Sequence, residues 1–331
     1  MYVVLLDGYP RHDTMAAFGH DNAPFLGDLE DRGFTVDRDS LSNYAKTWFT
    51  LVTMFHMRHL DDIELPPIES ATEDVRVINR ALNEAPSLDL LTSRGYDILS
   101  LPPPYADLQL WSVTDRLALP HLNSFEMGLI DAHLPAPISH ALERTVFADH
   151  ARAWSIDTFE RIREIARSSQ SRPRFVFAHL PLPHTPILFN ADGPVALDSA
   201  CYPETCPFQE HIADEIGLSV PEFWDAYAGQ VAWTNARLLE VVDAITEASP
   251  DAVVVLVSDH GSRYAPDTDP EERYRNLFAA RTPGEPDLFG QGSTPVNVLS
   301  AVFNAYLGTD YAIQPDDQFT GDLPAIERVE P

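Results

Sequence analysis

The stretch VVLVSDHGSR, residues 254–263, is an apolar run that ends in an acid, an imidazole and a glycine. An unbroken apolar run of this kind is typical of a strand buried on both faces of a parallel sheet. The polar pair Asp259 and His260 after it has two explanations. It is a polar turn, or it is two ligands held at the carboxyl end of a strand, and the rest of the sequence favours the ligands.

Similar strands occur elsewhere in the chain. Residues 2–6, YVVLL, precede Asp7, and the strand-like RPRFVFAHLPLPH, residues 172–184, places His179 and His184 at or beyond its end. Helix-like segments alternate with these strands, after residue 22, after residue 46, over 141–168 and over 221–249. This alternation predicts an α/β fold with a mostly parallel central sheet and helices on both faces. We expect one domain over residues 1–331, with a loop inserted at about 190–218.

Four polar residues should meet at one edge of this sheet. The carboxyl ends of parallel strands lie together, and such folds bind ligands there. Three separate strands lead to this edge, and they end in Asp7, in His184 and in the pair Asp259-His260. Two carboxylates and an imidazole suit Mn²⁺ or Zn²⁺, whereas Mg²⁺ and Ca²⁺ are less suited to the nitrogen ligand. Each residue alone is better explained as a turn, a cap or a structural histidine, so the predicted metal site depends on their convergence.

Thr47 lies at a predicted helix start in SNYAKTWFTL, residues 42–51. A threonine hydroxyl becomes a nucleophile when a metal or base removes its proton, and a helix start favours an anion. The alternative is a plain helix N-cap, a common role of threonine. The neighbouring Lys46 would add positive charge.

Charge excludes some partners. The formal net charge is -29, from 51 acidic and 22 basic residues, and Lys46 is the only lysine. This balance argues against a nucleic-acid groove and against docking on an anionic lipid surface by charge alone. No stretch approaches the roughly 18 apolar residues that span a membrane. Because the chain starts directly on a core strand, we expect that membrane segments can precede it.

The two cysteines, Cys201 and Cys206, lie in the Pro-rich segment DSACYPETCPF, residues 198–208. They have no zinc-binding pattern of Cys and His around them. We favour a disulfide over two thiols, because exposed thiols are reactive, and a disulfide indicates an oxidising compartment.

Five motifs carry a resemblance to a known family. They are VVLLDGYPR, DNAPFLGDLEDRGF, SNYAKTWFTL, FAHLPLPHTPILF and VVLVSDHGSR. Their order and approximate spacing resemble the alkaline phosphatase superfamily in its sulfatase-like branch, over most of residues 2–310. The chain looks most like sulfatase-like domains attached to bacterial membrane proteins, and its site is similar to that of lipoteichoic acid synthases and phosphoethanolamine transferases.

This resemblance implies roles for the motif residues. Asp7, Thr47, Asp259 and His260 would ligate one metal, with Thr47 also the nucleophile, and His184 would lie near the substrate phosphate or its leaving group. Formylglycine sulfatases need Cys or Ser where Thr47 stands, followed by Pro and Arg, so that subgroup is disfavoured. Two-metal relatives carry a further histidine after the Asp-His-Gly motif. No histidine follows His260, so the one-metal pattern fits better.

We therefore expect a metal-dependent phosphoryl-transfer enzyme, either a phosphodiesterase or a transferase of a phospho-substituted alcohol. Asn43, Lys46 and Arg263 are candidate contacts to the substrate oxygens. The substrate would be a phosphate or sulfate ester, with a lipid or a cell-envelope glycan as candidates, and the domain would lie outside the cytoplasm in a membrane-associated protein. One alternative is a sulfate-ester hydrolase without formylglycine, and another is a catalytically degenerate binding module.

Overall fold

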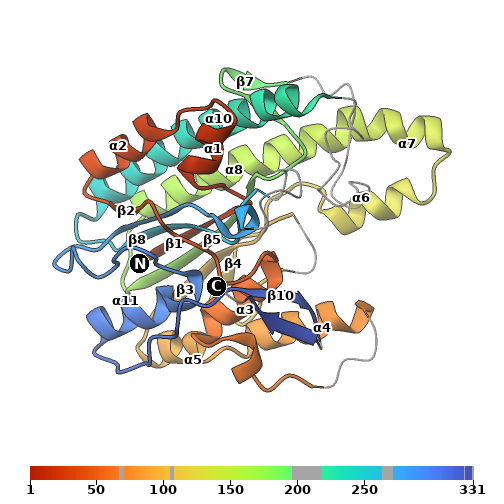
Figure 1. Ribbon diagram of the computed structural model, residues 1–331. Coiled ribbons are helices and arrows are strands. Elements are labelled where there is room, and N and C mark those ends of the chain that lie inside the picture. The colour runs from red at the N-terminus through yellow and green to blue at the C-terminus, as the bar shows by residue number, and fades with distance from the viewer. Residues whose placement is uncertain (67–70, 105–107, 196–217, 263–270, 324, 330–331) are drawn as a thin grey trace.

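Figure 1 shows the computed structural model of the chain. It describes residues 1–66, 71–104, 108–195, 218–262, 271–323 and 325–329. The inserted loop expected at about 190–218 begins with a small hairpin, β6 (Phe189–Asn190) and β7 (Gly193–Pro194). Cys201, Cys206 and Arg263 lie outside the described residues, so the disulfide and the role of Arg263 stay predictions.

The described residues form a central sheet of seven strands in the order β2-β9-β8-β1-β5-β3-β4. In that order the strands are Thr35–Asp37, Phe278–Arg281, Val254–Ser258, Tyr2–Asp7, Arg174–Pro183, Asp97–Leu101 and Asp115–Arg116. The five strands from β8 to β4 are mutually parallel, and β9 and β2 extend the sheet by antiparallel pairs. The predicted α/β fold with a mostly parallel sheet is confirmed.

Helices cover both faces of the sheet (Figure 1). On one face lie α1 (His12–Ala17), α2 (Ala23–Asp31), α8 (Ala148–Arg167) and α10 (Val220–Ala248), and on the other lie α3 (Thr47–His56), α4 (Ala71–Asn83), α5 (Pro86–Ser93) and α11 (Val298–Leu307). Successive side chains of a strand point to opposite faces. Val4 of β1 accordingly packs in the first core and Leu5 in the second. This is why these strands are apolar throughout.

The remaining elements lie around these layers. The helices α6 (Ser124–Asp131) and α7 (Ala136–Leu142) project beyond the sheet in Figure 1. A separate hairpin is formed by β10 (Phe319–Asp322) and β11 (Ala325–Arg328). Short helical turns are η1 (Leu60–Asp62), η2 (Glu143–Phe147), η4 (Glu272–Tyr274) and η5 (Pro295–Asn297).

The ends of two predicted helices are informative. The helix α10 begins where expected, because Ser219 and Glu222 form a capping box before the first turn. The helix expected over 141–168 is regular only from Ala148, because Glu143–Phe147 form a wider π-type turn. Over the described residues, no helix has both the length and the apolar content to cross a membrane.

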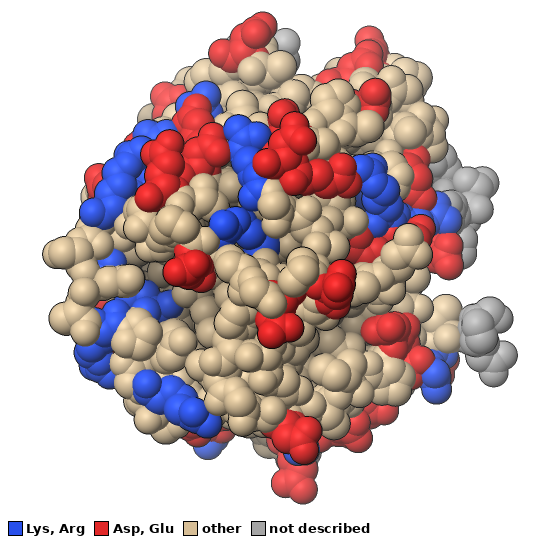
Figure 2. All heavy atoms as spheres, turned by 90° about the vertical axis from the view of Figure 1, so that its left-hand side faces the viewer, with Lys and Arg blue, Asp and Glu red and all other residues tan. Residues whose placement is uncertain are grey.

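The charges are mixed on the side of the molecule seen in Figure 2. There Lys and Arg lie among Asp and Glu, and they do not form one continuous area. Among the described residues, oppositely charged side chains form ion pairs, such as Arg32 with Asp243 and Arg163 with Glu240. This surface therefore offers no broad basic area for a polyanion.

Candidate metal centre and active site

Three buried polar side chains meet at the carboxyl ends of β1 and β8. Asp7 is the last residue of β1, and Asp259 and His260 directly follow β8. The two strands are parallel neighbours, with Leu6 beside Ser258, so their ends coincide. Asp7 is 4% exposed and the other two are 0% exposed. One ligand atom from each residue lies within 4.8 Å of the others.

Two glycines allow this close meeting. Gly8 has φ +68°, a left-handed conformation that lets the chain turn directly after Asp7, and its N–H donates to Asp259 Oδ1 at 2.9 Å. A Cβ on Gly261 would lie 2.1 Å from the carbonyl oxygen of Glu272. The third residue of the Asp-His-Gly motif is therefore glycine because the backbone of η4 packs against it.

The two oxygens of Asp259 have different surroundings. Oδ1 accepts the backbone N–H groups of Gly8 at 2.9 Å and of His260 at 3.0 Å. Oδ2 accepts no hydrogen bond from the described residues, although it is fully buried. The carboxylate is thus held through Oδ1, and Oδ2 is the oxygen that can bind a ligand.

His260 is oriented in the same way. Its Nδ1 lies 2.6 Å from the carbonyl oxygen of Gly261, and because a carbonyl only accepts, Nδ1 carries the proton. In a neutral imidazole Nε2 then has a lone pair. That atom is buried 3.5 Å from Asp7 Oδ1 and 3.4 Å from Asp259 Oδ2, and it has no hydrogen bond within the described part of the chain.

These atoms fit a metal ion. A lone pair that faces two carboxylate oxygens is unfavourable unless a cation lies between them. The separations of 3.4 and 3.5 Å are long for hydrogen bonds. They match the spacing of ligands around one tetrahedral ion, because atoms bound at about 2.0–2.2 Å lie about 3.3–3.6 Å apart. The carbonyl that fixes the other nitrogen of His260 is the usual outer partner of a metal-binding histidine.

Two further histidines lie near Asp7. His179 of β5 is fully buried, with Nε2 3.7 Å from Asp7 Oδ2. His184 follows β5, is half-buried, and its ring centre lies 6.4 Å from that of His260. Burial raises the pKa of Asp7, but the imidazoles of His184, His179 and His260 lower it by more, and the result lies well below the usual range. Asp7 is therefore ionised, as a metal ligand must be.

His184 has a defined orientation. Its backbone N–H donates to the carbonyl oxygen of Asp7 at 3.0 Å, and its Nδ1–H donates to the carbonyl oxygen of Thr185 at 2.8 Å. The bond to Thr185 therefore fixes Nδ1 as a protonated nitrogen of the half-buried His184. His179 lies within the strand, as expected, but its contact with Asp7 was not expected from the sequence.

Thr47 begins α3, after Lys46 in an extended conformation. Its hydroxyl makes no hydrogen bond with the described residues, so the N-cap alternative is not observed. One turn later, the hydroxyl of Thr50 donates to the carbonyl oxygen of Asp259 at 2.9 Å. This bond fixes the first turn of α3 against the cluster. Sequence reasoning missed Thr50, although its spacing of three from Thr47 places both on one helix face.

Two of the three residues expected to contact the substrate, Asn43 and Lys46, already have partners within the protein. Asn43 is fully buried, and its amide group bonds to the backbone of Val296 and Asp317. Lys46 forms an ion pair with Asp322 of β10 and lies over the ring of Phe49. The side chain of Asn43 is thus committed to the fold, and Lys46 already has an acidic partner.

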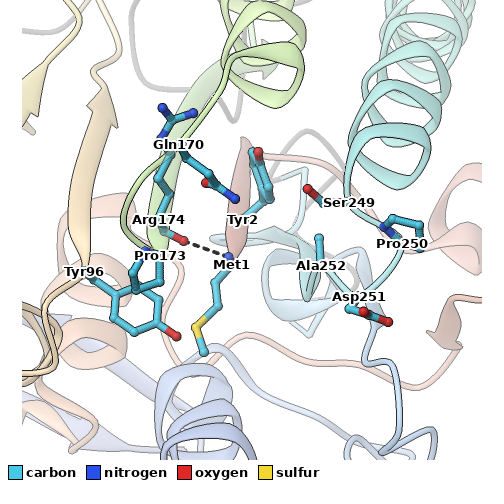
Figure 3. Close-up of a pocket in the computed structure, with 10 residues that line it drawn as sticks. All are labelled: Met1, Tyr2, Tyr96, Gln170, Pro173, Arg174, Ser249, Pro250, Asp251 and Ala252. Atoms are coloured by element: carbon cyan, nitrogen blue, oxygen red, sulfur yellow. Dashed lines mark hydrogen bonds between the residues drawn. The ribbon is translucent and has the colours of Figure 1, made fainter.

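The described pocket lies elsewhere. A hollow of about 360 Å³ is found at the amino ends of the strands, beside Met1, Tyr2, Tyr96, Arg174 and Asp251 (Figure 3). The Met1 amino group donates to the carbonyl oxygen of Arg174 at 2.8 Å. The hollow is at the opposite end of β1 from Asp7, so the candidate site does not depend on it.

Comparison with known proteins gives a family. The model of the sulfatase family matches residues 111–299, more than half of the chain. This range contains His184, Asp259 and His260, whereas Asp7 and Thr47 precede it. No curated protein matches the chain.

Solved structures share the fold at low identity. The C-terminal periplasmic domain of EcEptC from Escherichia coli, in complex with Zn, has 12% identity and a TM-score of 0.59, over 99% of this chain and 91% of that one. Phosphonate monoester hydrolase of Agrobacterium radiobacter has 14% identity and a TM-score of 0.58, over 93% and 73%. The soluble domain of lipooligosaccharide phosphoethanolamine transferase A from Neisseria meningitidis has 13% identity and a TM-score of 0.56, over 91% and 86%.

Proposed function

The chain belongs to the sulfatase family of enzymes, and we propose that it catalyses metal-dependent phosphoryl transfer with Thr47 as nucleophile. It acts as a phosphodiesterase or as a transferase that moves a phospho-substituted alcohol to an acceptor. The observation that carries the proposal is the meeting of Asp7 Oδ1, Asp259 Oδ2 and His260 Nε2, three buried acceptors that receive no hydrogen bond from the described residues. Burying such groups is costly unless a cation compensates them.

Asp7, Asp259 and His260 hold one divalent ion in this proposal, with Thr47 as the fourth ligand. The nitrogen ligand favours Zn²⁺ or Mn²⁺ over Mg²⁺ or Ca²⁺. When bound, the ion supplies positive charge that favours loss of the threonine proton and offsets charge on the phosphoryl oxygens. The two carboxylates formally balance the two charges of such an ion, and the neutral imidazole adds none.

The protein residues divide the transfer into two steps. Thr47 loses its proton to solvent, and its oxygen bonds to phosphorus as the bond from phosphorus to the leaving alkoxide breaks. His184 Nε2–H protonates that alkoxide. Water or an acceptor alcohol then returns a proton to Nε2 and attacks phosphorus, which breaks the bond to Thr47. The Thr47 oxygen takes back a proton from solvent, and this restores the starting state. The bond from Nδ1 to Thr185 keeps Nε2 as the exchanging nitrogen in both steps.

The wider setting is also part of the proposal. We place the chain as a single catalytic domain outside the cytoplasm, in a membrane-associated protein, with a disulfide between Cys201 and Cys206. Its substrate is an ester of a lipid or a cell-envelope glycan. The similarity in fold to a periplasmic domain and to a lipooligosaccharide phosphoethanolamine transferase supports this setting.

The test compares ester classes on metal-loaded protein. Purified chain with Zn²⁺ or Mn²⁺ is given p-nitrophenyl phosphate, bis-p-nitrophenyl phosphate and p-nitrophenyl sulfate, alongside Thr47→Ala. We expect turnover of the phosphodiester that Thr47→Ala lacks. Faster turnover of the sulfate would favour the sulfate-ester hydrolase. Protein that binds neither metal and turns over no ester would favour the degenerate binding module.

A further inference from the structure

We infer that Thr50 is a positioning residue that fixes the nucleophile Thr47 relative to the metal ligand Asp259. This inference rests on the proposed function and adds a residue to its machinery. The only direct contact it needs is the hydrogen bond from the Thr50 hydroxyl to the backbone of Asp259, at 2.9 Å.

The bond is buried at both ends. Thr50 and Asp259 are each 0% exposed. Among the described residues, Thr50 is the one donor that reaches the Asp259 carbonyl oxygen. Leaving a buried carbonyl oxygen without its donor costs free energy, and this cost stabilises the hydrogen bond between Thr50 and Asp259.

The bond joins two parts of the site that come from distant segments. The side chain of Asp259 is held toward β1 through the N–H of Gly8, and its carbonyl is held toward α3 through Thr50. Thr47 lies one turn before Thr50, on the same face of the helix. The hydroxyl of Thr50 therefore sets where the first turn of α3 sits relative to the carboxylate.

A purely structural role for Thr50 is the competing explanation, because many buried threonines only satisfy their own helix. Thr53 is such a residue and makes a matched control. It lies one turn further along α3, is also 0% exposed, and its hydroxyl donates to the carbonyl oxygens of Phe49 and Thr50 within the helix. Its hydroxyl makes no hydrogen bond to Asp259.

The experiment uses Thr50→Val, Thr50→Ser and Thr53→Val in the full chain, with wild type beside them. Zn²⁺ affinity by competition with a chelating dye, melting temperature of the metal-free protein, and kcat and KM for bis-p-nitrophenyl phosphate are measured. We expect Thr50→Val to weaken Zn²⁺ binding and to lower kcat by about 10–100-fold, the usual effect of losing an outer partner of a ligand. KM should stay near wild type, since substrate contacts remain. Thr50→Ser should restore both values, and Thr53→Val should keep them.

Each outcome decides the inference. If wild type binds Zn²⁺ and turns over the diester while Thr50→Val behaves like Thr53→Val, the positioning role is wrong and the proposed function stands. If wild type does neither, both are overturned. Should Thr50→Val fail to fold, Thr50→Ala against Thr50→Ser isolates the hydroxyl, and equal kcat and Zn²⁺ affinity for these two would reject the role.

Discussion

The two ends of the central sheet differ in how they treat polar groups. At the amino ends, a hollow of about 360 Å³ is lined by groups such as Asp251, which is exposed to water. At the carboxyl ends, Asp7, Asp259 and His260 are buried, and each has an acceptor atom that no N–H or O–H of the described residues reaches. The hollow by itself is therefore the poorer indicator of function. Buried acceptors that face each other cost free energy, and a bound cation explains why the fold keeps them.

The largest expected effect comes from a substitution at the carboxyl end of β8, compared with one at its amino end. Asp259→Ala removes a charged ligand directly after β8, and we expect Zn²⁺ to bind at least about 100-fold more weakly, beyond the usual loss for an outer partner. Diester turnover should fall with it. Asp251→Ala, before the same strand, is the control, and it should keep wild-type metal content because its side chain is exposed.

Melting temperature gives an independent measure of the same site. Zinc at 100 times its dissociation constant stabilises a one-site protein by about 2.7 kcal/mol. Wild type and Asp251→Ala should melt at a higher temperature with zinc, and Asp259→Ala should not. Retained metal in a folded Asp259→Ala protein would return the Asp-His-Gly motif to an ordinary turn.

Thr47→Ala should separate chemistry from metal binding at the carboxyl end. It deletes a hydroxyl and no fixed charge, so Zn²⁺ should be weakened less than in Asp259→Ala. Turnover should fall by about 10³-fold or more, as expected for a lost nucleophile. Intact-mass measurement of wild type quenched during turnover should detect a phosphoryl adduct that Thr47→Ala lacks. Undiminished turnover in Thr47→Ala would remove this residue from the mechanism.

The two histidines of the β5 region should have different effects. His184→Gln removes the proposed proton donor and should lower kcat by about 10²-fold, the lower end for general acid–base catalysis, while metal content is kept. His179→Gln alters a fully buried side chain against Asp7 Oδ2 and should act mainly on metal affinity. If His179→Gln lowers kcat more than His184→Gln at saturating zinc, the two roles are exchanged.

The sequence predicted the parts of this site that follow long apolar runs. The strands β1, β5 and β8 are each recognisable from their apolar composition. Asp7, His184 and Asp259 lie at or directly after the ends of these strands. The antiparallel β9 was not predicted, because its four residues carry too little pattern.

Side-chain partners from distant segments were also not predictable. The amide of Asn43 is taken by backbone groups at positions 296 and 317, and Lys46 is paired with Asp322. No local spacing connects these positions. The hydrogen bond from Thr50 to Asp259 could not be predicted from the sequence for the same reason.

The smallest expected effect concerns the amino-end hollow itself. Tyr96 lines it, and burial raises the pKa of its hydroxyl, so the group is neutral at physiological pH and carries no charge that could attract an anionic ester. Tyr96→Phe should therefore leave kcat, KM and zinc affinity at wild-type values and change the melting temperature only slightly, since surface changes of this kind are usually within about 0.5 kcal/mol. Steady-state kinetics with the diester and zinc titration check this directly. A raised KM in Tyr96→Phe would mean that the hollow takes part in substrate binding. The contrast between the two ends of the sheet would then be wrong, because a hollow without converging buried acceptors would be functional.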